Sequence, residues 1–319
     1  MTKQDGMPYL GIDLGGTNIQ AVLVVDGKIR QRADTKTKAE LGAGEVLRRI
    51  VKCCDKLIDA EGIKLKEVAG AGIGAPGAID ISSGIVLTAV NLGWKDFPLR
   101  QALAEELAMP VVVDNDVNVG VWGEYRVGAG QGFDDLFGLF IGTGIGGGLV
   151  LNRRIFHGAN FTAGEIGHTL LRADAGLGRR TVEDLASRTS MAELLVKLIQ
   201  TGRSSMISDL VDGDYSKVRS KVLAKALAAE DPLTVEVVKQ AARHVGMTIA
   251  NVVTLLSLPC VVVGGGATEA FGEAWMRWIT ESFRQCVFPA ELADCKLIAS
   301  QLGDDAGPMG AAMLAAAGR

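Results

Sequence analysis

The stretch Gly11-Ile12-Asp13-Leu14-Gly15-Gly16-Thr17-Asn18 decides the fold of this chain. An apolar run at residues 9–12 leads into Asp13 and the glycine pair, and a second apolar run at residues 19–25 follows them. The second run ends at Asp26-Gly27. An Asp-Gly pair beside an apolar run is a strong hairpin signal. The pattern therefore predicts two strands joined by a glycine loop.

This loop brings backbone N–H groups, the Thr17 hydroxyl and the Asp13 carboxylate to one place. Glycine lets the main chain approach a phosphate closely, and successive N–H groups form a concavity that binds anions. A carboxylate repels a bare phosphate, so Asp13 fits this place if a divalent cation lies between them. A polar hairpin turn is the alternative, but Asp-x-Gly-Gly-Thr is longer than a turn requires and favours binding of nucleotide phosphates.

Composition describes a soluble globular chain of 319 residues, with 48% hydrophobic and 22% charged residues and a net charge of −4. This size allows two domains, and this charge gives no reason to expect nucleic acid or an anionic membrane as a partner. No apolar stretch is long enough for a membrane span, and residues 1–8 carry no secretory signal. The five cysteines include no C-x-x-C pair, which predicts a cytoplasmic protein. The 41 glycines cluster in a few turns, which suggests several close approaches of backbone to ligand.

The first 115 residues alternate apolar runs of strand and helix type. Helical spacing at residues 44–61 precedes a buried strand at 68–75, a short helix at 99–107 and a strand at 111–113, and a further helix begins behind Asp116. This alternation is typical of an α/β layer architecture.

The second half opens like the first, with an apolar strand at 136–141, a glycine turn at 142–148 and a strand at 149–151. We interpret this as a weak internal repeat and expect two related domains. The remaining pattern predicts helices at 182–200, 223–229, 232–256, 271–287 and 310–317, and strands at 260–263 and 297–299.

Two further glycine clusters have the character of ligand loops. Residues 142–148 match G-x-G-x-x-G, but a strand follows them where a dinucleotide site requires a helix, so a second phosphate-binding hairpin fits better. Gly264-Gly265-Gly266 ends a strand before a helix, at the edge where open α/β sheets bind ligands. A simple strand-to-helix turn needs at most one glycine, so three favour a ligand face.

Polar side chains suited to bind a sugar or to accept a proton lie at two places. In Asp114-Asn115-Asp116-Val117-Asn118, Asp116 either caps the helix that follows or accepts the proton of a hydroxyl that attacks a phosphoryl group. In Glu165-Ile166-Gly167-His168, a carboxylate and an imidazole can serve the hydroxyls of a polyol, although a structural histidine is the alternative. Asn91 and Glu183 are further candidates.

In this order, these motifs resemble those of the ROK family of sugar kinases, and the likeness covers nearly the whole chain. The resemblance implies the two-domain actin-like ATPase (ribonuclease-H-like) fold with the nucleotide in the interdomain cleft. The smaller α/β domain would comprise residues 1–116, with the C-terminal helix 303–319 packed back on it, and the larger α/β domain residues 117–302.

The resemblance also implies roles for single residues. Asp116 would be the catalytic base, and Asp13 would lie near Mg²⁺, in contact through water. The sugar would be held by Asn91, Asn115, Glu165, His168 and Glu183. ATP would be bound by a first phosphate motif (Asp13, Gly15, Gly16, Thr17, Asn18), a second (Gly142, Thr143, Gly144) and an adenosine-side motif (Gly264, Gly265, Gly266).

One departure from the family concerns zinc. The family usually carries Cys-x-Cys-Gly-x-x-Gly-Cys-x-Glu, whose cysteines bind a structural zinc together with the histidine of Glu-Ile-Gly-His. Here residues 173–183 read Ala-Asp-Ala-Gly-Leu-Gly-Arg-Arg-Thr-Val-Glu and hold no cysteine. Structural zinc needs four good ligands. We therefore predict no zinc, a loop held by packing, and a His168 that serves the sugar alone.

These features predict ATP-dependent phosphorylation of a hexose at its 6-hydroxyl, most simply glucose, with Mg²⁺ as cofactor. A kinase for N-acetylmannosamine, fructose or allose is the alternative, because one hydroxyl or acetyl group changes only a few pocket contacts. A sugar-sensing transcriptional regulator of the same family is less favoured, since few residues precede the first strand and the chain is acidic. The resemblance suggests a homodimer, with the helix at 232–256 as the place to find an apolar interface.

Overall fold

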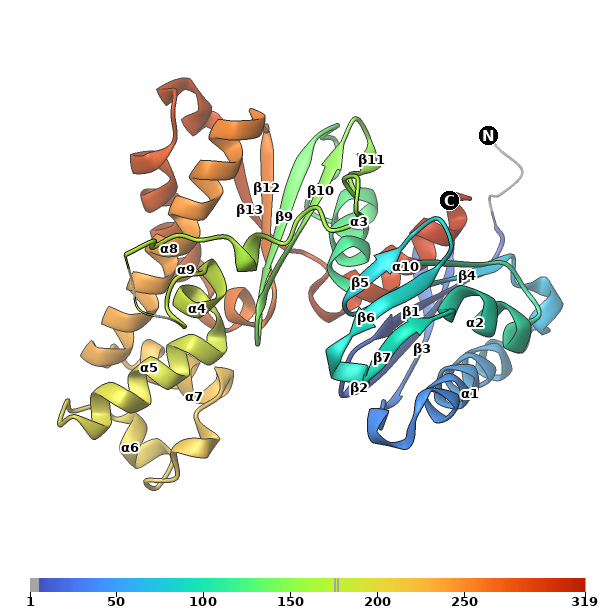
Figure 1. Ribbon diagram of the computed structural model, residues 1–319, viewed down its shortest axis with the longest axis horizontal. Helices are drawn as coiled ribbons and strands as arrows, with labels where there is room; N and C mark the ends of the chain where they lie inside the picture. The colour runs from blue at the N-terminus through green and yellow to red at the C-terminus, as the bar shows by residue number, and fades with distance from the viewer. Residues whose placement is uncertain (1–5, 175, 177, 319) are drawn as a thin grey trace. The chain divides into compact units, whose positions relative to one another are not determined.

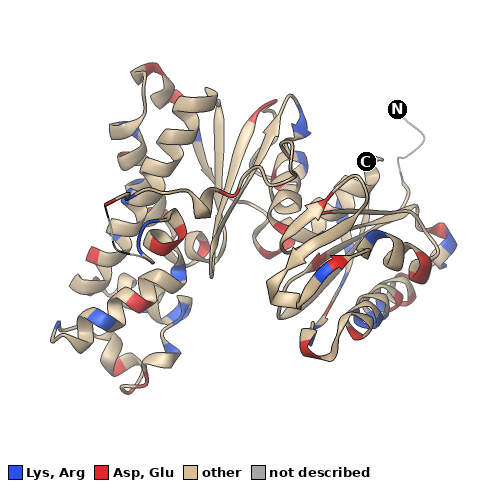
Figure 2. Cartoon of the chain, in the orientation of Figure 1, with Lys and Arg blue, Asp and Glu red and all other residues tan. Residues whose placement is uncertain are grey.

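The computed structural model describes residues 6–174, 176 and 178–318, which form two compact units (Figure 1). Unit 1 comprises Met1–Asp134, Gly148–Ala163 and Asp304–Arg319, and unit 2 comprises Asp135–Gly147 and Gly164–Gly303. Within the described residues, no helix combines the length and the apolar character needed to cross a membrane. Charged residues of both signs lie along the outer helices (Figure 2).

Unit 1 is built on a five-stranded sheet with the strand order β3-β2-β1-β4-β8. The hairpin of β1 (Tyr9–Leu14) and β2 (Asn18–Val25) is antiparallel, as is the pairing of β2 with β3 (Lys28–Lys36), which confirms the turn predicted at Asp26-Gly27. The strands β4 (Gly70–Ala75) and β8 (Val111–Asn115) join in parallel. Strand β4 is buried along its whole length, because helices cover both faces of the sheet.

On one face lie α1 (Ala43–Glu61), which follows the short η1 (Ala39–Leu41), and α2 (Leu99–Leu107). The apolar side of α1 packs on β2 and β3, and its outer side carries an ion-paired Glu45, Arg48 and Arg49. On the other face lie α3 (Asp116–Val127) and α10 (Ala306–Ala316), which pack on each other and on β4.

Helix α10 approaches the sheet so closely that glycine is required at the contact. A Cβ atom on Gly11 would overlap the carbonyl oxygen of Pro308, and one on Gly72 would overlap that of Ala311. Gly310 of α10 meets Val119 and Gly123 of α3 in the same way. The interpretation of clustered glycines as approaches to a ligand was therefore wrong for these four, which allow backbone to pack on backbone.

A small antiparallel sheet in unit 1 was not predicted. It consists of β5 (Ala78–Asp80), β6 (Ile85–Ala89) and β7 (Trp94–Phe97), and the short η3 (Val90–Leu92) between β6 and β7 carries Asn91. Strands this short contain too few alternations of apolar and polar residues to be recognised by period. A 3₁₀ turn, η2 (Leu65–Glu67), leads into β4.

The second sheet has the strand order β11-β10-β9-β12-β13, which repeats the order of the first. Its strands are β9 (Leu136–Ile141), β10 (Ile145–Leu151), β11 (Arg154–Ile155), β12 (Cys260–Gly264) and β13 (Lys296–Ala299), with β12 parallel to β9 and β13. The predicted internal repeat is confirmed. The predicted glycine turn at 142–148 was too long, because β10 already begins at Ile145. A Cβ on Gly147 would crowd the Phe137 ring and Ile166, so this glycine belongs to a packed strand.

Helices cover the described part of unit 2. They are α4 (Val182–Ala186), α5 (Arg188–Gln200), α6 (Ile207–Leu210), α7 (Ser220–Ala228), α8 (Pro232–Leu256) and α9 (Gly266–Cys286), with the 3₁₀ turns η4 (Ile166–His168), η5 (Tyr215–Lys217), η6 (Ala290–Asp294) and η7 (Gly303–Asp305), the last shared with unit 1. The single helix predicted at 182–200 was wrong: Ser187 is extended and caps α5 by accepting the Ser190 N–H. Helix α8 has the predicted bounds, because Asp231 caps it and Pro232 begins it.

Candidate functional site

The first glycine loop joins β1 to β2 and is fixed from β3. The Gly15 N–H donates to the Asn18 carbonyl (2.9 Å), and the buried Thr37 hydroxyl donates to the Gly15 carbonyl (2.6 Å). Gly16 lies against Asn91, whose Cβ is 3.0 Å from where a Cβ of residue 16 would stand. Asn91, which the sequence predicts as a sugar contact, thus lies beside the first loop. Thr37 was not foreseen, because nothing in the sequence marks the end of β3 as part of the loop.

Asp13, near the end of β1, is a partly buried carboxylate beside the start of α10, where Gly307 leaves room for it. Burial, followed by the charges of Asp116 and Asp304, raises the pKa of Asp13 to about 7. The carboxylates of Asp13, Asp116 and Asp304, all in unit 1, therefore interact electrostatically in one region. In the chain as far as it is described, no group of three or more His, Cys, Asp or Glu side chains is arranged to hold a metal by itself.

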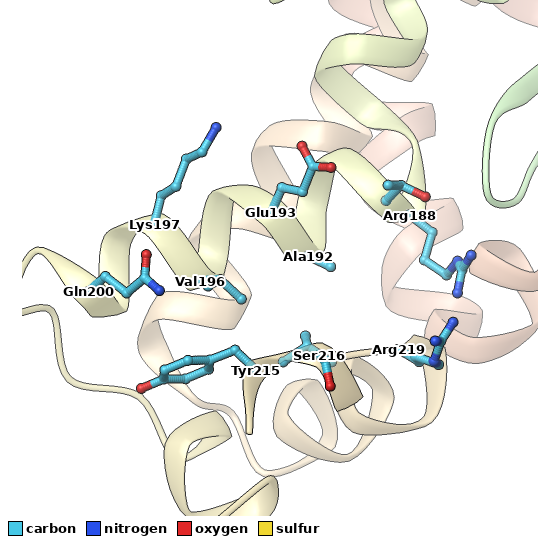
Figure 3. A pocket seen from close by; sticks show the side chains of 11 residues that line it. Arg188, Ala192, Glu193, Val196, Lys197, Gln200, Tyr215, Ser216 and Arg219 are labelled. Carbon is cyan, nitrogen blue, oxygen red and sulfur yellow. The ribbon is translucent and has the colours of Figure 1, made fainter. Parts of the chain in front are cut away.

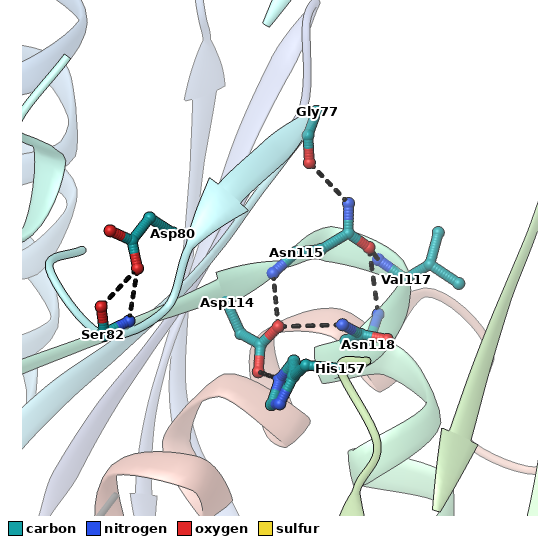
Figure 4. A network of polar contacts seen from close by, with 8 residues as sticks. All are labelled: Gly77, Asp80, Ser82, Asp114, Asn115, Val117, Asn118 and His157. Atoms are coloured by element: carbon teal, nitrogen blue, oxygen red, sulfur yellow. Dashed lines mark hydrogen bonds and ion pairs between the residues drawn. The ribbon is translucent and has the colours of Figure 1, made fainter. Parts of the chain in front are cut away.

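The turn between β8 and α3 is organised by hydrogen bonds (Figure 4). Asn115 is the cap of α3: its Oδ1 accepts the N–H groups of Val117 (2.9 Å) and Asn118 (3.3 Å), and its Nδ2 donates to the Gly77 carbonyl (3.2 Å). The reading in which Asp116 merely caps the helix was therefore wrong. Asp116 is the first residue of α3, and its Oδ1 accepts the Val117 N–H (2.9 Å).

The second glycine loop, residues 142–144, is joined to α4 and α5 of unit 2. The Glu183 carboxylate accepts the Ile145 N–H (2.7 Å) and lies where a side chain on Gly144 would stand. Arg188, the first residue of α5, donates its N–H to the Gly142 carbonyl (3.0 Å) and its guanidinium to the Thr143 hydroxyl (2.6 Å). The structure thus brings Glu183 onto the loop. Arg188 was missed, since an arginine at a helix start has no distinctive sequence pattern.

A cavity of about 480 Å³ begins at Arg188 and runs along α5 (Figure 3). Arg188 and Arg219 lie at one end, and Tyr215 and Gln200 lie at the other. Between them the cavity is lined by the apolar residues Ala192, Val196 and Val218 and by Glu193. A cavity with a cationic end, apolar walls and a few polar groups suits an amphipathic anion.

Glu165 precedes the turn η4, and His168 is its last residue. Both side chains are exposed, by 54% and 71%, and the His168 Nε2 is 4.0 Å from the Glu165 carboxylate. The turn packs so closely on the start of β10 that a Cβ on Gly167 would overlap the Ile145 carbonyl. Glu183 bonds the N–H of the same residue, so these two predicted sugar-binding segments meet at Ile145.

The third cluster, Gly264-Gly265-Gly266, has packing reasons at two of its three positions. A Cβ on Gly264 would crowd the Phe140 ring, and Gly265 has a positive φ (85°) beside the Ile141 backbone. Only Gly266 faces open space. The argument that three glycines in a row favour a ligand is weakened accordingly.

The segment where the family carries zinc-binding cysteines lies partly outside the described residues, because 175 and 177 are not described. Beside that gap, Leu170 pairs with Thr181 in an antiparallel bridge, and the Leu171 N–H donates to the Arg180 carbonyl (2.8 Å). Thr181 and Asp184 form a reciprocal cap at the start of α4. Backbone pairing and this cap hold the ends of the segment.

Comparison with known proteins agrees with this arrangement. The sequence matches the ROK family over residues 9–317. A glucokinase from Halalkalibacterium halodurans is 34% identical over 315 residues, which cover 96% of this chain and 94% of that protein.

Two solved structures are similar in fold and sequence. One is a ROK family glucokinase from Streptomyces griseus in complex with glucose and AMPPNP (TM-score 0.84, 31% identity, 96% of this chain and 98% of the other). The other is a ROK hexokinase from Thermus thermophilus (TM-score 0.80, 30% identity, 96% and 97%). This chain shares the two-domain actin-like ATPase fold of these structures. Because the family match spans nearly the whole sequence, this chain belongs to the ROK family.

Proposed function

We propose that this protein is an ATP-dependent sugar kinase that transfers the γ-phosphoryl group of ATP to the 6-hydroxyl of glucose. The observation that carries the proposal is the likeness, over almost the whole chain, to a glucokinase crystallised with glucose and AMPPNP, an ATP analogue. Glucokinases of 31–34% identity and full coverage support the same activity. Other sugars remain alternatives, because a small change of pocket contacts changes hexose preference.

Asp116 is the proposed base. Its carboxylate stands at the first position of α3, where the Asn115 cap and the end of β8 fix its backbone. It accepts the proton of the 6-hydroxyl as the oxygen bonds to the γ-phosphorus, while the bond to the bridging oxygen breaks and ADP leaves. Because the transition state is largely dissociative, orientation of the attacking oxygen matters more than the strength of the base.

Asp13 is the proposed contact for Mg²⁺, through water. The donor set fits, because the charges of Asp116 and Asp304 oppose ionisation of Asp13 and a divalent cation would favour it. Mg²⁺ commonly uses one or two carboxylates together with substrate phosphates, so three protein ligands are not needed. When bound, Mg²⁺ would neutralise charge on the β- and γ-phosphates.

The remaining predicted residues divide between sugar and nucleotide. We propose that Asn91, Asn115, Glu165, His168 and Glu183 surround the sugar, and that the loops 15–18 and 142–144 hold the phosphates together with Gly264, Gly265 and Gly266. Two of these residues are already hydrogen-bonded: Asn115 by its cap and Glu183 by the Ile145 N–H. Each carboxylate or amide still has further lone pairs or protons to offer a hydroxyl.

We further propose that the cavity along α5 takes the nucleoside of ATP. Its cationic end begins at Arg188, which is hydrogen-bonded to the second glycine loop, so phosphates on that loop would continue into it. From Arg188 to Gln200 the helix extends about 18 Å, which is enough for a nucleoside monophosphate unit. The apolar walls at Ala192, Val196 and Val218 suit a base.

The test of the activity is ADP release measured with a panel of hexoses and N-acetylmannosamine. Glucose should give the largest kcat/KM, and Asp116→Asn should bind glucose with wild-type affinity yet lose at least about 10³-fold in kcat. Absence of sugar-stimulated ADP release would remove the kinase assignment. Full turnover by Asp116→Asn would remove only the role of Asp116.

Arg188→Gln tests the cavity. It should raise the KM for ATP by roughly tenfold or more and leave the KM for glucose unchanged, because a charge-assisted contact to phosphate is worth about 1.5–3 kcal/mol. Arg203→Gln is the matched control, since Arg203 pairs with Glu236 outside the cavity lining. If Arg188→Gln and Arg203→Gln had the same KM for ATP, the cavity would be excluded from ATP binding.

We also propose the compartment, the pathway and the assembly of the protein. The five cysteines are free, as suits a cytoplasmic enzyme, and glucose 6-phosphate would enter glycolysis. We also propose a homodimer, argued below from exposed apolar side chains at the end of α8.

A further inference from the structure

Beside the proposed base lies a buried carboxylate to which the reaction above assigns no role. Asp114, the penultimate residue of β8, is 1% exposed. Its Oδ1 accepts the backbone N–H of Asn115 (2.7 Å) and the side-chain amide of Asn118 (3.0 Å), and its Oδ2 is 2.7 Å from the His157 Nε2 (Figure 4). The pair with His157 is the contact of the three that comes from a distant part of the sequence, 43 residues away.

These contacts fix the turn that carries Asp116. The bond from the Asn115 N–H sets the backbone at the end of β8, and the bond from Asn118 ties the first turn of α3 to the same carboxylate. Asp116 lies between these two points, and its Cα stands close to Gly74 of β4 on the other side. The Asp114 carboxylate therefore acts together with the Asn115 cap to fix the Asp116 backbone.

His157 completes the set of hydrogen bonds that fix the direction of the Asp114 carboxylate. The χ2 torsion of an aspartate has a broad distribution, so each hydrogen bond to a carboxylate oxygen narrows its orientation. His157, with a side chain about one-quarter exposed, holds the second oxygen, Oδ2. Because the carboxylate is an acceptor, the imidazole donates from Nε2, which sets its tautomer. Without this donor, Asp114 would have one buried oxygen unsatisfied.

We propose that His157 is a positioning residue for the phosphoryl transfer: through its hydrogen bond to Asp114, it holds the turn that places Asp116. This inference rests on the proposed role of Asp116. An error of about 1 Å in the position of a reacting group can cost about 10²-fold in rate. His157→Leu should therefore lower kcat by about 10- to 100-fold, while the KM for ATP changes less than about twofold.

Gln places an amide donor near the position of Nε2, so His157→Gln should recover most of the lost kcat. Thr234→Val is the control for simple destabilisation, because it removes a buried hydrogen bond to Asp231 at the start of α8, in the other unit. That variant should lower the midpoint of thermal unfolding and leave kcat unchanged.

A double-mutant cycle with Asp116→Asn separates the two proposals. If His157 acts through Asp116, His157→Leu should cause no further loss of kcat in the Asp116→Asn background. The positioning role would be overturned if the two losses of kcat multiplied in the double variant, or if a folded His157→Leu protein kept the wild-type kcat. In either case the Asp116 assignment would stand. Full activity of Asp116→Asn alone would overturn the assignment on which this inference rests.

Discussion

Asp13 is the residue that links the proposed site to the stability of the fold. Its pKa is raised to about 7, first by burial and then by the charges of Asp116 and Asp304. The folded protein therefore binds a proton at Asp13 over a pH range in which the unfolded chain has already released it. Between about pH 4 and pH 7, this group makes the free energy of unfolding fall as the pH rises.

Asp13→Asn removes this dependence. Relative to wild type, the ligand-free variant should gain stability as the pH rises from 4 to 7, by up to about 4 kcal/mol above pH 7, because about three pKa units are relieved. Thermal and urea unfolding between pH 4 and 9 would measure the difference, and turnover should fall by orders of magnitude. Asp55→Asn, on the exposed side of α1, is the control and should run parallel to wild type. If the stability of Asp13→Asn changed with pH in parallel with that of wild type, the raised pKa of Asp13 would be contradicted.

At this scale the sequence predicts residue types better than their contacts. The motif around Asp13 identified a carboxylate beside a glycine loop, because both lie within eight residues of each other. It assigned the cap of α3 to Asp116 when Asn115 makes it, since both types cap helices equally well. His157 and Arg188 were invisible, because their partners Asp114 and Thr143 are more than 40 residues away. The proposed sugar and nucleotide contacts stay predictions.

Among the elements, α10 shows why glycines are required in a sheet without any ligand. Gly11 of β1 and Gly72 of β4 lie where the α10 backbone touches the two central strands. Gly11→Ala would place a methyl group on the Pro308 carbonyl and push the helix away. Overpacking of a tight core costs about 1–3 kcal/mol and sometimes more, so we expect a loss of about 3 kcal/mol or more.

Urea unfolding with a fluorescence readout would measure that loss. Gly44→Ala is the matched control: Gly44 lies in α1, a Cβ there would meet nothing within 4 Å, and alanine should be neutral or add up to about 1 kcal/mol. If both variants unfold at the same urea concentration, α10 does not need the close approach.

The elements that periodicity predicts well are those with long apolar faces. Helix α2, strand β9 and helix α8 have the predicted bounds, since each combines a clear period with an identifiable start or stop. The strands β5, β6 and β7 were missed because three to five residues show no reliable period. The break at Ser187 was missed because serine is tolerated within helices, and its capping bond is visible only in the structure.

Across the whole molecule, the two sheets share one strand order, and this could be foreseen from a repeated local pattern. A strand, a glycine loop and a second strand open each half of the sequence, and in each the following strands add in parallel beside the first. The predicted division at residue 116 stays a proposal. In the structure, residues 116–134 and 148–163 group with unit 1, because α3 packs on α10 and β4.

Assembly into a homodimer is the last property we predict, and it is argued from unit 2. The end of α8 and the segment after α9 present large apolar side chains to solvent: Leu255 is 81% and Phe288 is 72% exposed. They belong to one surface, because the Phe288 N–H donates to the hydroxyl of Thr254 (3.1 Å). Exposed apolar surface of this kind marks interfaces, and a second copy of the chain can cover it symmetrically.

Leu255→Glu should therefore shift the protein from dimer to monomer, because the introduced carboxylate would be buried without a partner at the two-fold interface. Size-exclusion chromatography with light scattering over a range of protein concentrations measures this. Leu41→Glu, an equally drastic change at an exposed leucine of unit 1, should leave the dimer intact. A monomeric wild type, or a Leu255→Glu protein as dimeric as wild type, would exclude this surface. Because dimer formation would bury apolar area at the end of α8, the midpoint of thermal unfolding should also rise with protein concentration in wild type and not in Leu255→Glu.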